Sequence, residues 1–533
     1  MPGEYIDFRE TGYFSDLICD YLDEKSPLRF CYHRFPSIEN FKQQLEEKSD
    51  SFSAANRAVL AAALIKQYHK TRTSPETLEN LRLLEKDNTF TVATGHQLNL
   101  FTGPLYFLYK IVSTINLCRK LKQAYPTYNF VPVYWMATED HDFDEIAYFN
   151  LNGKKFQWNR SHGGAVGELS TEGLESIFEL LASEFGGGMN ADALKKLFED
   201  AYVGHKNLAN ATRYLANELF KAYGLVIVDG NDTNLKRLFI PHMQTELLTQ
   251  SASDHIQETN GSLSTLGYKI QVNPRAINLF YLKPGLRERI VEQDGVYYIN
   301  ETDLKFSKEE ILQQLKDHPE RFSPNVVMRP LYQEVILPNL CYIGGGGELA
   351  YWLQLKSFFD TAKIPFPVLL LRNSVLVLNE KQQQKLDKLE AGYRHLFLKQ
   401  HDLINRKVRE ISDIDIDFTP QKEHLKKQFE ALYELAGKTD ESFLGAVKAQ
   451  EVKQLKGLNK LEKRLLKAQK RKLEDHVNRI VALQNELFPN GSLQERNLNF
   501  SQFYLAYGRQ FLETLLAETD PLALKFSIIV LDN

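Results

Sequence analysis

Two polar turns, each with a histidine, contain the side chains of this sequence best suited to chemistry, and the second turn is also rich in acidic residues. The first turn, Thr94 to Gln97, reads TGHQ, and the second, Thr138 to Glu145, reads TEDHDFDE. A carboxylate accepts a proton from an attacking amine, and clustered carboxylates supply the oxygen ligands that Mg²⁺ prefers. An imidazole beside a phosphoryl or adenylyl oxygen would neutralise its charge. We therefore predict four catalytic residues: Asp140, His141, Asp142 and His96.

A third polar turn, GGGGE at 344–348, precedes a predicted helix, and Arg372 follows a later apolar run. Glycines let a backbone approach a ligand closely, and a guanidinium binds a carboxylate through two hydrogen bonds. The turn does not match the GxxxxGK[ST] or GxGxxG patterns, which disfavours P-loop chemistry and hydride transfer. The residues predicted to bind substrate or nucleotide are Thr94, Gly95, Gln97, Gly103, Tyr106, Trp135, Arg329, Gln333, Gly345, Gly346, Glu348, Tyr351, Arg372 and Ser374.

The elements that position these turns are predicted to be parallel strands with crossing helices. The run Phe90 to Thr94 indicates a buried strand, and apolar residues at helical spacing between Leu105 and Leu121 indicate a helix. A second strand, Phe130 to Ala137, completes a βαβ unit, so the first two polar turns should lie at one edge of the sheet. The simpler alternatives are that His96 and Gln97 cap a turn and that the acidic loop is a solvated surface.

The domain organisation follows from changes in the pattern along the chain. Residues 1–149 should form N-terminal helices and the first half of the core, and residues 321–378 its second half. Residues 150–320 read as an insertion. In it, six residues could reach over the site, although a structural role is favoured for each: Tyr268, Gln271, Arg275, Asn278, Phe280 and Tyr281. Residues 379–490 are predicted to form an antiparallel coiled coil, and 491–533 to return to the core.

The coiled coil is expected from leucines at helical spacing in Lys381 to Gln400 and Glu441 to Leu487. We read these as two long helices that support a homodimer. Basic residues between Lys460 and Lys472 could hold RNA or phosphates, but a solvated coiled-coil face is favoured. The single strong apolar pattern near the end, Phe526 to Leu531, reads as a strand after a helix from Phe500 to Leu516.

The composition sets outer limits. The chain has 533 residues, of which 43% are hydrophobic and 25% charged, a balance typical of a soluble globular protein of roughly three domains. A formal net charge of -4 argues against a surface adapted to nucleic acid. The four cysteines have no CxxC spacing, so neither a zinc site nor a disulfide framework is expected. Without a signal-like start or a membrane-length apolar run, we expect a cytoplasmic protein and no membrane partner.

Four motifs together resemble the bacillithiol-biosynthesis cysteine-adding enzymes, the cysteine ligase family. They are TGHQLNLFTGPLYFLYK, VPVYWMATEDHDFDE, SPNVVMRPLYQE and GGGGELAYWLQLK, in this order and ahead of a coiled coil. The resemblance implies an α/β fold with a Rossmann-like parallel sheet related to class I aminoacyl-tRNA synthetases, connecting-peptide insertions and a C-terminal α-helical coiled coil. It places the turn Thr94 to His96 at the nucleotide-binding position, and Arg372 to Ser374 near the second synthetase signature.

The resemblance also implies a reaction, the addition of cysteine to the glucosamine amine of glucosaminyl-malate to form bacillithiol. Amide formation from a free carboxylate is uphill, so ATP is the candidate activator, with Mg²⁺ as its companion ion. Asp140 or Asp142 would accept the amine proton, and Arg329 or Arg372 would suit the malate carboxylates. The alternatives are a non-catalytic RNA-binding or scaffold protein acting through the coiled coil, and a synthetase-like ligase acting on another amine.

Overall fold

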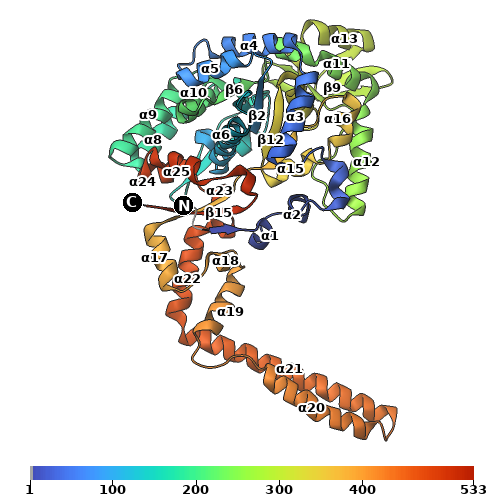
Figure 1. Cartoon of the computed structure of the whole chain (residues 1–533), viewed down its shortest axis with the longest axis vertical. Helices are drawn as coiled ribbons and strands as arrows, with labels where there is room; N and C mark the ends of the chain where they lie inside the picture. The colour runs from blue at the N-terminus through green and yellow to red at the C-terminus, as the bar shows by residue number, and fades with distance from the viewer. Residues whose placement is uncertain (1–3, 162, 533) are drawn as a thin grey trace.

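The computed structural model describes residues 4–161 and 163–532. A broad body contains the sheets, and a hairpin of two long helices, α20 and α21, projects from its lower end (Figure 1). The two ends of the described chain lie close together beside β15, in the middle of the molecule (Figure 1). The N-terminal and C-terminal segments are therefore both parts of one folded body.

The core is a five-stranded parallel sheet with the order β13-β12-β2-β3-β6. The strands are β2 (Thr89–His96), β3 (Asn129–Met136), β6 (Val226–Asp229), β12 (Asn339–Gly344) and β13 (Val368–Leu371). All eight residues of the central strand β2 are buried, as expected for a strand covered on both faces. Helix α6 (Tyr106–Ala124) joins β2 to the parallel strand β3 and packs along both. The predicted βαβ unit is thus confirmed.

One strand of this sheet contradicts the predicted insertion. Val226–Asp229 lies within residues 150–320, which are predicted to be an insertion. In the structure it forms the edge strand β6 of the core sheet, parallel to β3. The strand is only four residues long, and its apolar run reads the same in either sheet. The strand pairs with β3 because it packs against α4 (Ala54–Tyr68), α5 (Pro75–Leu83) and α10 (Leu208–Phe220). The hydroxyl oxygen of Tyr68 on α4 accepts a hydrogen bond from the N–H of Ile227 in this strand at 2.8 Å.

The segment around this strand contains a second, antiparallel sheet with the order β10-β9-β8-β7-β11. Its strands are β7 (Leu279–Lys283), β8 (Leu286–Gln293), β9 (Val296–Ile299), β10 (Lys305–Ser307) and β11 (Phe322–Pro324). A separate hairpin pairs β4 (Tyr148–Leu151) with β5 (Lys154–Gln157). The helices of this part are α7 (Phe143–Ile146), α8 (Leu174–Phe185), α9 (Met189–Phe198), α11 (Thr233–Thr249), α12 (Ser251–Thr265) and α13 (Lys308–Asp317).

Helices from the rest of the body complete the layers around the core sheet. Helix α3 (Ile38–Ser51) packs against β12, and Ser53 caps α4 by accepting from the N–H of Asn56 at 3.2 Å. The helix predicted after the GGGGE turn is two helices, separated by a turn at Leu353 to Leu355. The remaining helices here are α1 (Phe8–Thr11), α2 (Asp16–Leu22), α3 (Ile38–Ser51), α14 (Met328–Ile336), α15 (Gly346–Trp352) and α16 (Lys356–Ala362).

The C-terminal segment returns to the body through a third sheet. Strand β15 (Phe526–Leu531) pairs with β1 (Glu4–Ile6) on one side and β14 (Val375–Asn379) on the other. The predicted final helix is broken at Gly508, whose φ of +58° suits glycine, into α24 (Phe500–Tyr507) and α25 (Gln510–Glu518). Helix α25 packs on α6, so this segment reaches the core sheet from the far end of the chain.

The coiled coil forms from a different helix pair than the sequence suggests. The antiparallel hairpin is α20 (Thr419–Ala436) with α21 (Glu441–Lys472), whereas Lys381 to Gln400 is not one long helix. That run breaks near Gly392, where Glu390 has a φ of +47°. It contributes α17 (Glu380–Lys388), α18 (Tyr393–Leu396) and the first residue of α19 (Gln400–Ile411). The second predicted helix also bends at Leu473 and continues as α22 (Glu474–Leu487), which packs on α19; α23 (Gln494–Asn497) follows.

Candidate functional site

A cavity of about 940 Å³ opens at the carboxyl ends of the core strands. Its walls include Gly95 and His96 from the end of β2, Trp135 from β3, Gly230 after β6 and Gly345 after β12. The prediction that the first two polar turns lie at one edge of the sheet is therefore confirmed, and the third turn lines the same cavity. This volume is in the range of cavities that hold small-molecule ligands.

Most of the predicted site residues line this cavity. They are His96, Asp140, His141, Asp142, Gly95, Gln97, Tyr106, Trp135, Arg329, Gly345, Gly346, Glu348, Tyr351 and Arg372. Three of the six insertion residues also line it, namely Gln271, Arg275 and Phe280, although a structural role was favoured for them. Their position at the cavity depends on the docking of the antiparallel sheet over the core, which no local pattern indicates.

Four predicted binding residues do not line the cavity. Thr94 donates its hydroxyl to the carbonyl of Ile343 at 2.7 Å and so joins β2 to β12. Gly103 has a φ of +62° in the turn before α6, where a Cβ would clash with Asn99. The other two, Gln333 and Ser374, are fully buried behind arginines of the cavity wall. Of the four, Thr94 is the one that directly precedes a lining residue, Gly95.

Arg329 on α14 is a cavity-lining cation with no carboxylate partner among the described residues. Its Nη1 donates to Gln333 Oε1 at 3.1 Å, and its Nη2 donates to the Tyr351 hydroxyl at 3.3 Å. The guanidinium carbon also lies 5.6 Å from the ring centre of Tyr342 and 6.0 Å from that of Trp135. Neutral oxygens and aromatic faces hold this charge in place and leave it available to an anion.

Arg372 is committed elsewhere, which contradicts its predicted role with the malate carboxylates. Its Nη1 and Nη2 donate to the two carboxylate oxygens of Glu495 at 3.0 and 2.7 Å, and Nη1 also donates to Ser374 Oγ at 3.0 Å. Both members of the ion pair are almost fully buried. A second carboxylate would have to compete with Glu495 for the two terminal nitrogens, so Arg372 joins the core to α23 and keeps only its Nε without a partner among the described residues.

His96 cannot act as the predicted cation. Burial, together with the neighbouring charge of Lys110, holds its pKa well below the ordinary histidine value. The imidazole is therefore neutral, and its buried Nε2 has no hydrogen-bond partner among the described residues. The ring packs edge-on against Tyr106, with the ring centres 5.4 Å apart. A neutral imidazole contributes a hydrogen bond to a ligand but no charge.

Lys110 is the positively charged side chain that contacts the TGHQ turn, and it is not among the predicted site residues. Its Nζ donates to the carbonyl of Gly95 at 2.7 Å and forms an ion pair with Glu348 Oε2 at 2.6 Å. Glu348 also accepts from the Tyr342 hydroxyl at 2.8 Å and from the N–H of Gly345 at 2.9 Å. These donors keep the pKa of Glu348 low despite burial. The pair therefore fixes the glycine turn to the end of β2.

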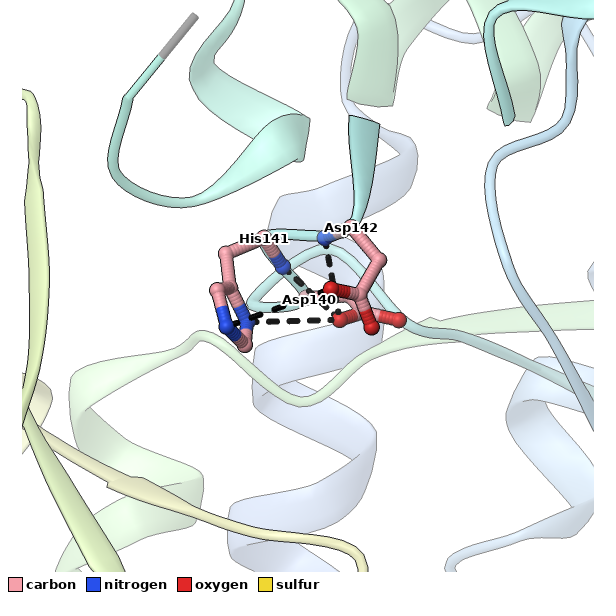
Figure 2. A group of neighbouring side chains, drawn as sticks. All are labelled: Asp140, His141 and Asp142. Carbon is pink, nitrogen blue, oxygen red and sulfur yellow. Dashed lines mark hydrogen bonds and ion pairs between the residues drawn. The ribbon is translucent and has the colours of Figure 1, made fainter. Parts of the chain in front are cut away.

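The acidic loop after β3 brings Asp140, His141 and Asp142 together, as Figure 2 shows. Asp140 Oδ1 accepts from the N–H of His141 at 2.7 Å, and Oδ2 accepts from Gln97 Nε2 at 2.9 Å. These bonds and the nearby charge of Arg287 lower the pKa of Asp140 far below its ordinary value. Asp140 therefore holds the loop and is a weak base. The carboxylate of Asp142 is more exposed and accepts no hydrogen bond from the described residues.

Arg287 on β8 reaches across the cavity to this loop. Its Nη1 donates to His141 Nδ1 at 2.5 Å, and its guanidinium carbon lies 3.9 Å from the ring centre of Phe280. Since an arginine only donates, Nδ1 is the acceptor and the proton of neutral His141 sits on Nε2. The same guanidinium disfavours a cation among Asp140, His141 and Asp142, although their ligand atoms lie within 4.8 Å of one another. The three residues do not fit a directly bound Mg²⁺.

Basic side chains outnumber the available carboxylates around the cavity. Within residues 4–161 and 163–532, five lining arginines have no ion pair: Arg275, Arg287, Arg289, Arg329 and Arg496. The remaining lining cations, Lys110 and Arg372, are paired with glutamates. Of the lining carboxylates, Glu139 is paired with the buried Lys236 and Glu348 with Lys110. The excess positive charge favours anionic ligands.

Several of these residues escaped prediction for a common reason. Arg287, Arg289 and Arg496 lie in unremarkable surroundings of the sequence, and only the packing of distant segments brings them to the cavity. Lys110 is different, because a lysine within the apolar run of α6 was a usable signal of a buried charge that needs a partner.

Two models of known protein families match this chain, one over the core and one over the coiled-coil domain. Residues 1–373 match the family model of the bacillithiol biosynthesis BshC N-terminal Rossmann-like domain, and residues 375–531 match the BshC C-terminal coiled-coil domain. The chain belongs to the BshC family. The predicted Rossmann-like core and coiled coil are confirmed, and so is the predicted family.

Relatives in the BshC family are similar over the full length. The "Putative cysteine ligase BshC" of Christiangramia forsetii is 61% identical, covering 99% of each chain, and that of Flavobacterium johnsoniae is 58% identical over 100% of each. That of Bacillus cereus is 27% identical over 94% of this chain and 95% of its own. A solved structure described as a putative arginyl-tRNA synthetase of Campylobacter jejuni covers 83% of this chain and 97% of its own, but its TM-score of 0.22 at 11% identity carries no argument.

As a BshC family member, the chain is an enzyme of the ligase class that forms a carbon–nitrogen bond, as predicted. In the described residues, no helix combines the length and the apolar character that a membrane crossing requires.

Proposed function

We propose that this protein joins the carboxyl group of cysteine to the glucosamine amine of glucosaminyl-malate, forming the amide of bacillithiol. The observation that carries the proposal is the distribution of charge in the cavity. Five arginines without an ion pair to any described residue line the same cavity as the exposed carboxylate of Asp142. A substrate with a dicarboxylate at one end and an amine at the other matches this polarity. The names of the BshC relatives support cysteine as the second substrate.

Arg329 is the proposed receptor for the malate end. It lines the cavity, lacks a carboxylate partner and is held by a glutamine and a tyrosine hydroxyl. Gly95 lies beside this guanidinium, since a Cβ at position 95 would be 3.7 Å from Arg329 Nη1. A bidentate bond to a carboxylate supplies both affinity and orientation. The exposed Arg275 and Arg289 lie on the opposite wall, within the antiparallel sheet segment, and would receive a second anionic group.

The amine end is proposed to lie at Asp142. An amine attacks a carbonyl only after it loses a proton, and Asp142 is a loop carboxylate that accepts no hydrogen bond from the described residues, with His141 Nε2 4.0 Å from its Oδ1. His141 would donate its Nε2 proton to the reacting carbonyl oxygen or to a hydroxyl of the sugar, because Arg287 occupies Nδ1. Asp140 is proposed to hold both neighbours in position rather than to take the proton.

ATP is the proposed activator of the cysteine carboxyl, for which it would supply the leaving group. Arg275, Arg289 and Arg496 are exposed and have no ion pair within the described chain, so their positive charges match the negative charges of a polyphosphate. Gly347 has open space where a Cβ would be, which leaves room beside the glycine turn. Neutral His96 would donate or accept one hydrogen bond. We assign no protein ligand to Mg²⁺.

The decisive experiment incubates the purified protein with cysteine, ATP and glucosaminyl-malate and follows the thiol product by mass spectrometry. We expect bacillithiol, and we expect glucosamine without malate to react poorly because it cannot engage Arg329. Product formation from any amine at equal rates would support a ligase with another acceptor. No product under conditions in which glucosaminyl-malate binds would refute the proposed reaction.

We also propose that two copies associate through the helical hairpin. Large apolar side chains remain exposed on α20 and α21, and they are Leu432, Leu435, Phe443, Leu444, Val452 and Leu461. Two copies would bury them against one another, as in coiled-coil assemblies. Light scattering should give the mass of two chains, and the Leu435→Lys variant should give one. The wild-type protein eluting as a single chain would refute the dimer.

A further inference from the structure

A buried hydrogen-bond network lies directly behind Arg329. Gln333 follows Arg329 by one helical turn on α14 and is fully buried, whereas Arg329 lines the cavity. We propose that Gln333 is a positioning residue that holds the Arg329 guanidinium toward the anionic group of the substrate, with its amide oriented by the buried carboxylate of Glu334. This inference rests on the proposed function and names the support of its anion receptor.

The orientation of the Gln333 amide is determined by its two neighbours. Its Oε1 accepts from Arg329 Nη1 at 3.1 Å, and its Nε2 donates to Glu334 Oε1 at 3.0 Å. A flipped amide would place its NH₂ against a guanidinium and its carbonyl against a carboxylate, and both contacts would be repulsive. Because Glu334 Oε1 accepts from both Gln333 Nε2 and Asn339 Nδ2, the Gln333 amide presents its oxygen to Arg329.

Glu334 is itself fixed from two other elements. Asn339 Nδ2 at the start of β12 donates to its Oε1 at 2.7 Å, and Lys48 Nζ of α3 lies 3.4 Å from its Oε2. Lys48 also donates to the backbone carbonyl of Glu334 at 3.1 Å. The side chains of Lys48 and Glu334 are at most 1% exposed. Lys48 and Asn339, which do not line the cavity, thus hold Glu334 in place behind Gln333 and Arg329.

A role in positioning explains why charges are buried here at all. A buried ion pair is a poor source of stability, because apolar residues of similar volume often serve as well or better. The network ends at Arg329, which has no carboxylate partner of its own in the described part of the chain. Its second contact, from Nη2 to the Tyr351 hydroxyl, fixes the other side of the guanidinium. Both fork nitrogens are therefore oriented before a ligand arrives, which lowers the cost of binding.

The test measures calorimetric binding of glucosaminyl-malate to the full-length wild type, Arg329→Met, Gln333→Met and the double variant. We expect Gln333→Met to weaken binding about tenfold, the worth of a hydrogen bond to a charged group. In the Arg329→Met background, the same change should cost nothing further, because Gln333 acts through Arg329. In turnover assays, Gln333→Met should raise KM and leave kcat nearly unchanged.

Gln44→Met is the matched control. Gln44 is also fully buried; its Oε1 accepts from Arg34 Nη1 at 2.7 Å, and its Nε2 donates to the carbonyl of Phe366 at 3.1 Å, away from the cavity. It has the same chemistry without a link to Arg329, so its loss should leave affinity for glucosaminyl-malate unchanged. Equal weakening by Gln333→Met in both backgrounds, or no weakening by it in a folded protein, would overturn the inference.

Three outcomes separate a failure of the inference from a failure of the proposed function or of folding. If wild type binds and converts glucosaminyl-malate while Gln333 shows no coupling to Arg329, the positioning role fails and the proposed function stands. If wild type does not bind glucosaminyl-malate, the proposed function fails first. If Gln333→Met does not fold, a crystal structure of wild type with glucosaminyl-malate decides: a carboxylate on Arg329 with the Gln333 bond retained supports the inference, and a carboxylate bound away from Arg329 overturns it.

Discussion

Arg372 and Glu495 form a buried, two-pronged ion pair between the end of the core sheet and α23, with donor–acceptor distances of 3.0 and 2.7 Å. They are 123 residues apart in the sequence, and the whole coiled-coil arm is inserted between them. The pair therefore connects the two chain segments that flank the coiled-coil domain. It also occupies both terminal nitrogens of Arg372, so neither is free for a two-pronged bond to a substrate carboxylate.

Breaking this pair should destabilise the protein strongly. Arg372→Met leaves the Glu495 carboxylate buried without its partner, for which we expect a loss of about 3–5 kcal/mol in the free energy of unfolding. The double variant Arg372→Met with Glu495→Met should recover much of that loss, since it removes both charges. Urea unfolding of the four proteins measures the cycle. Arg82→Met, which breaks an exposed ion pair with Glu79, is the control and should change little. Additive losses in the double variant would contradict this account.

Removing the unpaired cation of the cavity should act on binding rather than on folding. Arg329→Met is expected to weaken binding of glucosaminyl-malate by about 10- to 100-fold, because a charge-assisted bond to a carboxylate is lost. Arg329→Lys should restore part of the affinity, since a lysine supplies the charge but not the fork. Calorimetry measures both, with the exposed Arg82→Met as control. Unchanged affinity in Arg329→Met would place the malate end at another arginine.

Stability should depend on pH through His96. Its folded-state pKa is lowered by burial, so the folded protein keeps this imidazole neutral while the unfolded chain takes up a proton below about pH 6.5. The contribution to stability is therefore full above that pH and declines as the pH falls, at up to about 1.4 kcal/mol per pH unit. His96→Gln should lose this part of the slope in urea titrations between pH 5 and 8. The exposed His424→Gln is the control, and an unchanged slope in His96→Gln would show that the ring is not kept neutral.

The two aspartates of the acidic loop should respond differently to neutralisation. Asp142→Asn is expected to lower kcat by about 10²- to 10⁴-fold with little change in substrate affinity, as for the loss of a general base. Asp140→Asn should mainly raise KM, because it loosens the bonds to Gln97 and His141. Steady-state kinetics distinguishes the two. Asp144→Asn, an exposed neighbour on α7 that does not line the cavity, is the control. A larger fall in kcat for Asp140→Asn would exchange their roles.

The low pKa of Asp140 adds a second pH dependence. A carboxylate with a lowered pKa stabilises the fold above the ordinary aspartate pKa of about 4, and this stabilisation is lost as the pH falls below it. The acidic limb of the stability curve should therefore be shallower in Asp140→Asn than in wild type.

The positions of the polar turns could be predicted from the sequence because local signals define them. An apolar strand such as Phe90 to Thr94, followed by a glycine and a helical pattern, indicates a βαβ unit whose handedness is nearly invariant. This places Gly95 and Asp140 at one edge without any knowledge of distant contacts. Errors arose where local patterns are ambiguous, as in the four-residue strand β6 and in the broken helix after Lys381.

By itself, the sequence determined the parallel core, the edge at which its polar turns meet, and the existence of a helical arm, because each depends on hydrophobic periodicity and chain connectivity. Only the tertiary structure decided which charges are free to meet a ligand. Arg372 and Arg329 read alike as residues after apolar runs, yet one is paired with Glu495 and the other is unpaired. Charge pairing in a folded protein depends on distances between segments remote in the chain, and burial then sets whether a group such as His96 carries a charge at all.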